Sequence, residues 1–385
     1  MIRNREFDDI RPFYDEEVQG VVEELIADER FKSMVQSVFP NKDWTELTNL
    51  MRSLRTRKDF LYKVSWGIVS EIVSQSSQGV KSSGYENIEK TGAYTFMSNH
   101  RDIILDAAIL SVLLADHGFI IPKIAIGDNL LLQPWIENLV RVNGSFIVKR
   151  GVSMRQMLDT SLHLSRYIHY TIQEKKQSLW IAQREGRAKD SDDRTQESLL
   201  KMLGMGGKKD SFVDDIRRLN ICPVSLSYEY DPCDYLKAKE FQQKRDNPEY
   251  KKSQSDDLLS MEIGLFGFKG NIHFQIGKPI NTLFKSGDFP DDKSEQITSI
   301  AKLIDEEIFR NYKFYPVNYI AYDRMTNTKK FEDQYTEADI QFFDVYLRQQ
   351  ISKIDLPEKD IPFLTEKMVE MYSNPVKNFL SIANK

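Results

Sequence analysis

A histidine and two carboxylates lie close together at residues 99–106, where the sequence is Asn-His-Arg-Asp-Ile-Ile-Leu-Asp. A histidine acts as a general base when a nearby carboxylate fixes its orientation and tautomer. His100 is the candidate base, and Asp102 and Asp106 are the candidate carboxylates. The stretch follows an apolar run and precedes a helical pattern at 107–115. We therefore expect the histidine on a loop between a strand and a helix.

Basic residues end two further apolar runs, and each run lies beside a glycine. Residues 144–151 are Gly-Ser-Phe-Ile-Val-Lys-Arg-Gly, and residues 183–187 are Gln-Arg-Glu-Gly-Arg. Arginine binds phosphate through a planar set of donors, and glycine lets a ligand approach the backbone. The pattern indicates a phosphate site at the ends of two strands.

The elements that must position these residues alternate between strands and helices. Residues 153–172 place apolar side chains on one helical face, and other helical patterns separate several strand-like runs. This alternation favours an α/β fold with a mixed, largely parallel sheet flanked by helices. The predicted strands are 94–97, 123–126, 146–148, 179–182, 224–228 and 272–276.

Helical patterns also lie on both sides of this region. Residues 1–88 predict an N-terminal helical region, and its last part, 75–84, has the Ser- and Gly-rich composition of a linker. We expect an α/β domain over 89–312 and a C-terminal helical extension over 313–385. In that extension, Thr336 begins a helix as part of a capping box.

Two polar segments interrupt the α/β region. Residues 187–217 are rich in glycine and aspartate, which predicts a loop. Residues 233–258 are charged and poor in apolar side chains, which predicts a helical or disordered surface insertion.

Bulk composition excludes several classes of protein. The 385 residues are 41% apolar and carry a net charge of −5, so nothing in the bulk charge indicates a nucleic-acid partner. The two cysteines, Cys222 and Cys233, form no metal-binding pattern and are predicted to be reduced thiols. The N-terminus lacks the apolar core of a signal peptide, and the longest apolar runs are shorter than the about 20 residues that span a bilayer. We expect a cytoplasmic protein, with any membrane contact peripheral and on the cytoplasmic face.

Taken together, in this order and spacing, the stretches at 99–106, 144–151, 183–187 and 221–225 resemble the glycerolipid acyltransferases. This is the family of glycerol-3-phosphate and lysophosphatidic acid acyltransferases. Its blocks are an Asn-His-x-Ser motif with a following Asp, a Gly-x-x-Phe-Ile-x-Arg motif, a Phe-x-Glu-Gly-x-Arg motif and a strand led by proline. The second and third blocks match well, although the third lacks its phenylalanine. The resemblance covers roughly residues 90–312.

The first block departs from the family pattern in its spacing. The family has four residues between the histidine and the aspartate, whereas Asp106 is separated from His100 by five and Asp102 by one. An extra loop residue would leave Asp106 as the orienting acid. Without it, Asp102 orients the histidine or contacts substrate.

The resemblance implies a specific chemistry. His100 removes a proton from a glycerol hydroxyl, which then attacks the thioester of an acyl-ACP or acyl-CoA donor. Arg150 and Arg187 hold the acceptor phosphate of glycerol 3-phosphate or lysophosphatidic acid, Glu185 and Gly186 shape the pocket, and Lys149 or Arg184 assists. No metal or organic cofactor is implied. An acyl chain would need an apolar groove, and its candidate lining is Leu130, Leu131, Leu132, Trp135 and Ile136. The favoured alternative is that these five residues are ordinary core.

Two other functions remain open from the sequence. An acyltransferase for another lipid acceptor, such as a lyso-aminolipid, would keep His100 and depend less on the arginines. A non-catalytic lipid-binding protein would be consistent with the irregular spacing between His100 and Asp106. Assays with different acceptors distinguish these functions.

Overall fold

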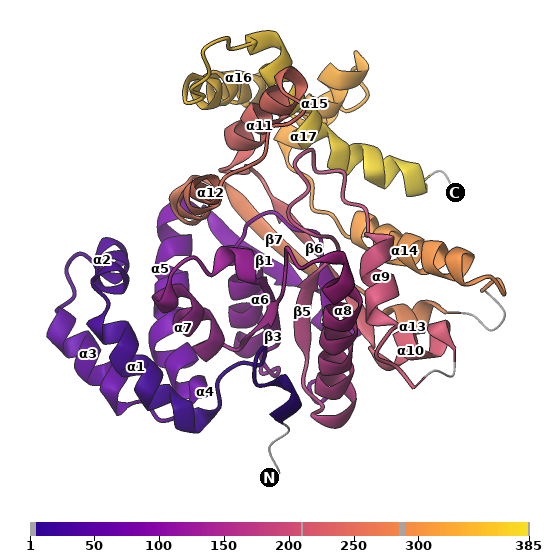
Figure 1. Ribbon diagram of the computed structural model, residues 1–385. Helices are drawn as coiled ribbons and strands as arrows, with labels where there is room; N and C mark the ends of the chain where they lie inside the picture. Colours follow the sequence, from indigo (N-terminus) through magenta and orange to yellow (C-terminus); the bar gives the residue numbers. More distant parts are fainter. Residues whose placement is uncertain (1–4, 209–210, 285–288, 384–385) are drawn as a thin grey trace.

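The computed structural model describes residues 5–208, 211–284 and 289–383 and has an α/β fold (Figure 1). Within these residues a seven-stranded sheet has the order β1-β7-β6-β2-β5-β3-β4. All neighbouring strands run parallel except β6 and β7, which pair antiparallel. The prediction of a mixed, largely parallel sheet is confirmed. The strands are β1 (Gly79–Ser83), β2 (Thr95–Ser98), β3 (Lys123–Gly127), β4 (Ser145–Val148), β5 (Leu179–Ala182), β6 (Ile221–Tyr228) and β7 (Asn271–Ile276).

The first strand corrects the linker prediction. Residues 79–83 pair along their whole length with β7, from Gly79 opposite Asn271 to Ser83 opposite Gln275. This edge strand is exposed or half-buried, so it lacks the apolar pattern that marks the central strands. Its polar composition indicated a linker, but its backbone pairs with a strand almost 200 residues away in the sequence.

Helices cover both faces of the sheet. Those that precede residue 220 are α1 (Val18–Ala27), α2 (Glu29–Val38), α3 (Trp44–Ser53), α4 (Arg57–Phe60), α5 (Trp66–Ser76), α6 (Leu105–Asp116), α7 (Pro134–Val142), α8 (Met154–His169), α9 (Glu197–Leu203) and α10 (Phe212–Arg218). One core joins the sheet to α1–α6, and a second joins it to α8–α10 and α14 (Lys293–Arg310). Phe96 faces the first core and Met97 the second, as alternation along a strand requires.

The remaining helices form an upper lobe above the sheet (Figure 1). They are α11 (Asp234–Asp246), α12 (Gln254–Phe266), α15 (Pro316–Thr326), α16 (Glu337–Ser352) and α17 (Ile361–Ala383), and α13 (Ile280–Leu283) lies below. Buried side chains of α11, α15, α16 and α17 make a third core. The predicted capping box is confirmed, because the Asp339 amide donates to Thr336 Oγ1 at 3.3 Å and the Thr336 amide donates to Asp339 Oδ2 at 2.8 Å at the start of α16.

The two polar segments also contain regular structure. The prediction of a continuous loop over 187–217 is wrong, since α9 and most of α10 fall inside it; residues 209–210 lie outside the described part. The insertion at 233–258 is helical and forms α11 and the start of α12. Six of the thirteen residues of α11 are buried, and three of these six are charged, so the charged sequence was a poor guide to exposure. Cys222 and Cys233 are free and buried.

Among the helices that the structure describes, none is both long enough and apolar enough to cross a lipid bilayer. The division into a helical region over 1–88, an α/β domain over 89–312 and a helical extension over 313–385 remains a prediction.

Candidate active site

The loop after β2 brings His100 and Asp106 together. His100 Nδ1 lies 2.8 Å from Asp106 Oδ2, and the His100 side chain is 13% exposed whereas that of Asp106 is fully buried. A carboxylate accepts at this distance, so Nδ1 carries the proton and Nε2 presents its lone pair. The arrangement suits a general base that receives a proton at Nε2.

A tight turn accommodates the additional residue between His100 and Asp106. The backbone amides of Arg101 and Asp102 donate to Asp106 Oδ2 at 2.6 and 3.0 Å. Asp106 lies in the first turn of α6, so its carboxylate points back over the loop. The geometry therefore pairs the histidine with Asp106.

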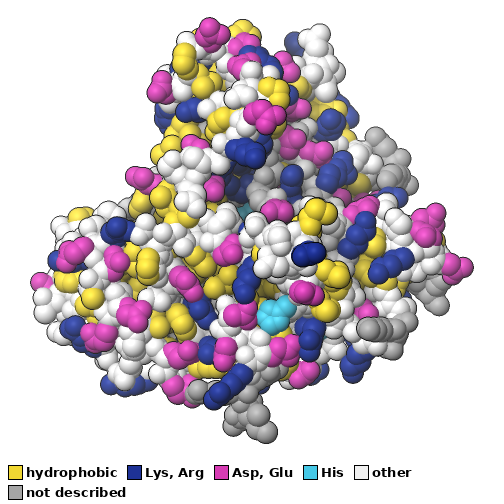
Figure 2. Space-filling model, in the orientation of Figure 1, with side chains coloured by type: hydrophobic (Ala, Val, Ile, Leu, Met, Phe, Trp, Pro, Cys, Tyr) yellow, Lys and Arg dark blue, Asp and Glu magenta, His cyan; other side chains and the backbone are white. Residues whose placement is uncertain are grey.

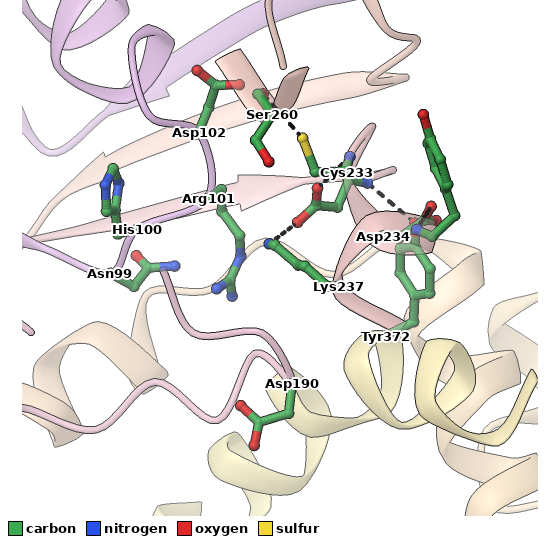
Figure 3. A network of polar contacts seen from close by, with 12 residues as sticks. Asn99, His100, Arg101, Asp102, Asp190, Cys233, Asp234, Lys237, Ser260 and Tyr372 are labelled. Carbon is green, nitrogen blue, oxygen red and sulfur yellow. Dashed lines mark hydrogen bonds and ion pairs between the residues drawn. The ribbon is translucent and has the colours of Figure 1, made fainter. Parts of the chain in front are cut away.

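Asp102 instead supports the start of α6. Its Oδ1 accepts the amides of Ile104 and Leu105 at 2.9 and 2.7 Å. Burial and the nearby charge of Asp106 raise its pKa. In Figure 3 its side chain points away from His100. The described contacts of Asp102 are structural, and the sequence-based alternative that it orients the histidine has no support in this geometry.

A buried ion pair holds the histidine loop against the rest of the fold. Arg101 donates to Asp193 through two bonds of 2.8 and 2.6 Å, and both side chains are at most 7% exposed. Asp193 also accepts the hydroxyl of Tyr312 at 2.6 Å. On the other side of His100, Asn99 exchanges two hydrogen bonds with the backbone of Leu226 on β6. These contacts fix Asn99 and Arg101, the residues on both sides of the histidine, and Figure 3 shows the positions of these three residues.

Trp180 on β5 packs against the histidine ring. The two ring centroids are 5.6 Å apart with an interplanar angle of 69°, an edge-on contact. The indole Nε1 donates to Ser98 Oγ at 3.0 Å, and that hydroxyl donates to the carbonyl of Asn99 at 2.7 Å. Trp180 thus limits the orientations open to the His100 ring. Sequence analysis did not identify it, because a tryptophan in a buried strand resembles ordinary core.

A cavity of about 1000 Å³ opens in front of His100. Parallel strands place the loops that follow them at the same edge of a sheet, which is where ligands bind in such folds. Ser98 pairs with Ala182, so the loops carrying His100 and Arg187 begin side by side. His100, Arg150 and Arg187 all line the cavity. Figure 2 shows Lys and Arg side chains gathered around the hollow below the upper lobe.

The predicted phosphate residues have different partners. Arg187 and Arg184 line the cavity without an ion-pair partner in the described ranges, and Arg187 Nη1 is a buried donor with no acceptor. Arg150 pairs with Glu185 across the rim, where Glu185 is 66% exposed. Lys149 pairs with Asp9 at 2.6 Å. Gly186 has φ +69°, and nothing lies within 4 Å of where its Cβ would be. Burial lowers the pKa of Arg187, but the nearby Cys233, Asp231 and Asp102 outweigh it and raise that pKa. Arg184 and Arg187 are the candidate anion ligands of the set that no described ion pair occupies.

The predicted apolar lining is confirmed only for Leu130. Leu131 packs against the core below the sheet edge, and Trp135 against the N-terminal helices. Other apolar residues line the cavity instead. They are Ile103, Ala125, Ile126, Val148, Val152, Met157, Leu164, Ile181, Leu199 and Met202.

Helix α12 packs directly on the histidine loop at Gly264. A Cβ at this position would lie 2.2 Å from Asp102 Oδ2. Gly264→Ala should therefore displace α12 or the loop and destabilise the fold by about 1–3 kcal/mol, as overpacking does. The melting temperature and kcat should both fall. Gly20→Ala is the matched control, because nothing lies within 4 Å of its added Cβ in α1. Equal melting temperatures for Gly264→Ala and Gly20→Ala would contradict the close packing of Gly264 against Asp102.

Metal chemistry has no candidate ligands in the part of the chain that the structure describes. No group of three His, Cys, Asp or Glu side chains there has the geometry to hold an ion.

A family model matches part of this chain. Residues 79–213 match the model described as Acyltransferase, and this segment contains His100, Asp106, Arg150 and Arg187. The resemblance to an acyltransferase family that the sequence motifs indicated is confirmed over this segment.

A particular solved structure is also similar. It is the 1-acyl-sn-glycerophosphate (LPA) acyltransferase PlsC from Thermotoga maritima, with 13% sequence identity and a TM-score of 0.35, over 76% of this chain and 94% of that chain. No curated protein sequence matches this chain.

Proposed function

We propose that this protein is an O-acyltransferase that moves a fatty acyl group from acyl-ACP or acyl-CoA to a hydroxyl of glycerol 3-phosphate or lysophosphatidic acid in phospholipid synthesis. One observation carries the proposal: His100, held by the buried Asp106, lines the same cavity as Arg187. A proton acceptor and an anion ligand are what an acceptor with a hydroxyl and a phosphate requires.

The reaction follows from the position of the imidazole. His100 Nε2 takes the proton of the acceptor hydroxyl, and the oxygen attacks the carbonyl carbon of the thioester. The carbon–sulfur bond then breaks, and the thiolate leaves with the proton that Nε2 held. Asp106 stabilises the imidazolium between these two steps. General-base catalysis supplies about 10²–10⁴-fold, and orientation in the cavity adds to it.

Arg187→Ala should weaken acceptor binding. A hydrogen bond to a charged group contributes about 1.5–3 kcal/mol, which corresponds to a loss of about 10- to 100-fold in kcat/KM for the phosphorylated acceptor. Saturation kinetics with acceptor varied and donor fixed measure the effect. Arg166→Ala is the control, because Arg166 pairs with Glu6 outside the cavity. An unchanged acceptor KM in Arg187→Ala would show that the phosphate binds elsewhere.

We also propose a peripheral contact with the membrane, which exposed apolar side chains at the start of α8 support. Met154, Met157 and Leu158 are 89%, 54% and 66% exposed on the first turns of α8, and Met157 also lines the cavity. A lipid surface on this face would let an amphiphilic substrate enter the cavity without crossing water.

The double variant Met157→Glu/Leu158→Glu should lower partition into anionic phospholipid vesicles at least about tenfold, since each buried apolar side chain contributes about 1.5–3 kcal/mol. Vesicle co-sedimentation measures the bound fraction. Met325→Glu is the control, because Met325 is 40% exposed on α15, in the upper lobe. Equal binding of all three proteins would exclude α8 as the contact.

A screen of acceptors tests the function as a whole. Purified protein is incubated with acyl-CoA or acyl-ACP and with glycerol 3-phosphate, lysophosphatidic acid or a lyso-aminolipid, and thiol release is followed. The proposal predicts turnover with a phosphorylated acceptor. Turnover only with the lyso-aminolipid would favour that acceptor class, and no turnover with any acceptor would favour a lipid-binding protein.

A further inference from the structure

The insertion between β6 and β7 builds a second wall of the cavity. Leu236, Lys239, Glu240 and Gln243 line it from α11, and their spacing of three and four residues places them on one helical face. Leu259 and Ser260 line it from α12. These helices follow the segment matched to the acyltransferase model, which ends at residue 213. The sequence pattern gave this insertion no function.

Most lysines on this wall are paired with a carboxylate. Lys237 pairs with Asp231 and Lys252 with Asp257, and Lys189, in the loop after β5, pairs across to Glu240 of α11. Lys239 differs, because no described carboxylate lies within ion-pair distance of it.

The nearest acidic group does not neutralise Lys239 by contact. Asp256 is close enough to interact with Lys239 electrostatically. However, Asp256 Oδ2 accepts both the amide and the hydroxyl of Ser253, at 2.8 and 2.7 Å, in the capping box of α12. Lys239 is therefore a half-buried cation that faces the cavity with its own hydrogen-bond donors available.

The unpaired cations thus lie on two different walls. Arg184 and Arg187 follow β5, beside the loop of His100, whereas Lys239 projects from α11. A glycerophosphate carries its phosphate only a few bonds from the reacting hydroxyl, so that phosphate must bind beside the histidine. An acyl thioester carries its phosphate at the far end of a long pantetheine arm, so that phosphate must bind away from the histidine.

We infer that the wall formed by α11 and α12 binds the phosphopantetheine arm of the acyl donor, with Lys239 as the charged contact to its phosphate. This inference rests on the proposed function and assigns the donor half of the same cavity. The phosphopantetheine group is common to acyl-CoA and acyl-ACP.

The upper lobe holds this wall in place. Asp234, at the start of α11, accepts the hydroxyls of Tyr346 and Tyr372 at 2.8 and 2.7 Å and the amide of Gln350 at 2.8 Å. All four side chains are buried. Helices α16 and α17 thereby anchor α11, and a fixed wall loses little entropy on binding an extended ligand.

Donor kinetics of Lys239→Ala and Lys239→Gln test the inference. We expect the donor KM to rise about tenfold with acyl-CoA and acyl-ACP, because one charge-assisted contact is lost, while the acceptor KM is unchanged. A short acyl thioester without phosphate, S-acyl-N-acetylcysteamine, should react equally well with all variants. Lys244→Ala is the control, since Lys244 lies on the same helix, pairs with Glu240 and does not line the cavity.

The outcomes separate this inference from the proposed function. An effect with every donor that the unmodified protein uses supports recognition of the shared arm, whereas an effect with only one of two active donors overturns it. An unchanged donor KM with both, or an equal loss with the phosphate-free thioester, overturns it. Should no acceptor be acylated, the proposed function fails, and titration of the protein with acyl-CoA still tests Lys239, because the variants should bind about tenfold more weakly.

Discussion

Replacing His100 by alanine is expected to lower kcat by about 10²–10⁴-fold, with a much smaller change in either KM. The imidazole faces the cavity with one nitrogen committed to Asp106, so its other nitrogen is the proton acceptor. Alanine removes this acceptor and leaves the arginines of the cavity in place. Steady-state thiol release with saturating donor and acceptor measures the loss.

Asp106→Asn should reproduce much of this defect through the histidine tautomer. Asp106 Oδ2 accepts the proton of His100 Nδ1 and two backbone amides of the loop. An asparagine supplies only one accepting oxygen and favours a histidine with its proton on the wrong nitrogen, a change that can cost up to about 10⁴-fold in a related triad. Burial and the charge of Asp106 also raise the pKa of Tyr228, which places this hydroxyl near the carboxylate.

His117→Gln is the matched control for the histidine. His117 ends α6, stacks on Tyr85 with 3.7 Å between ring centroids, and does not line the cavity. Its kcat should equal that of the unmodified protein. Unchanged turnover in His100→Ala, at equal folded content, would remove the general base from the account.

Arg101→Met is expected to destabilise the fold by about 3–5 kcal/mol, because it leaves the carboxylate of Asp193 buried and without its counter-ion. The pair lies in the interior. Burial lowers the pKa of Arg101, but the charge of Asp193 outweighs this effect and raises that pKa. Urea unfolding measures the change. The same variant should lose activity, since Arg101 adjoins His100.

A second substitution distinguishes loss of the pair from loss of the arginine. Arg101→Met/Asp193→Leu removes both charges, so stability should recover relative to Arg101→Met, as buried pairs replaced by apolar side chains often show. Arg245→Met is the control, because Arg245 pairs with Asp360 at the exposed surface and should matter little. Similar destabilisation in Arg101→Met and Arg245→Met would contradict a structural role for the buried pair.

Much of the sheet could be predicted because the central strands are buried on both faces. Apolar runs such as 179–182 admit few interpretations, and β5 has the predicted bounds. The edge strand β1 could not be predicted, since its order comes from pairing with β7 rather than from its own side chains. The charged sequence of α11 wrongly indicated an exposed helix, because some of its charged side chains form buried ion pairs, as Lys237 does with Asp231.

The chemical groups of the site were predictable, but their supports were not. His100 and Arg187 lie within short motifs, so their types and spacing were visible. Asp193, which neutralises Arg101, lies in a polar loop with nothing to mark it. The choice between Asp102 and Asp106 needed coordinates, because it depends on a turn that directs one carboxylate to the histidine and the other to a helix start.

The most direct test of the central claim is mass-spectrometric detection of the acylated product from acyl-CoA or acyl-ACP and a phosphorylated glycerol acceptor. The account predicts that the unmodified protein forms the acyl ester of glycerol 3-phosphate or lysophosphatidic acid, and that His100→Ala forms at most about one hundredth as much in the same time. Equal product from both proteins, or none from the unmodified protein with either acceptor, would contradict it.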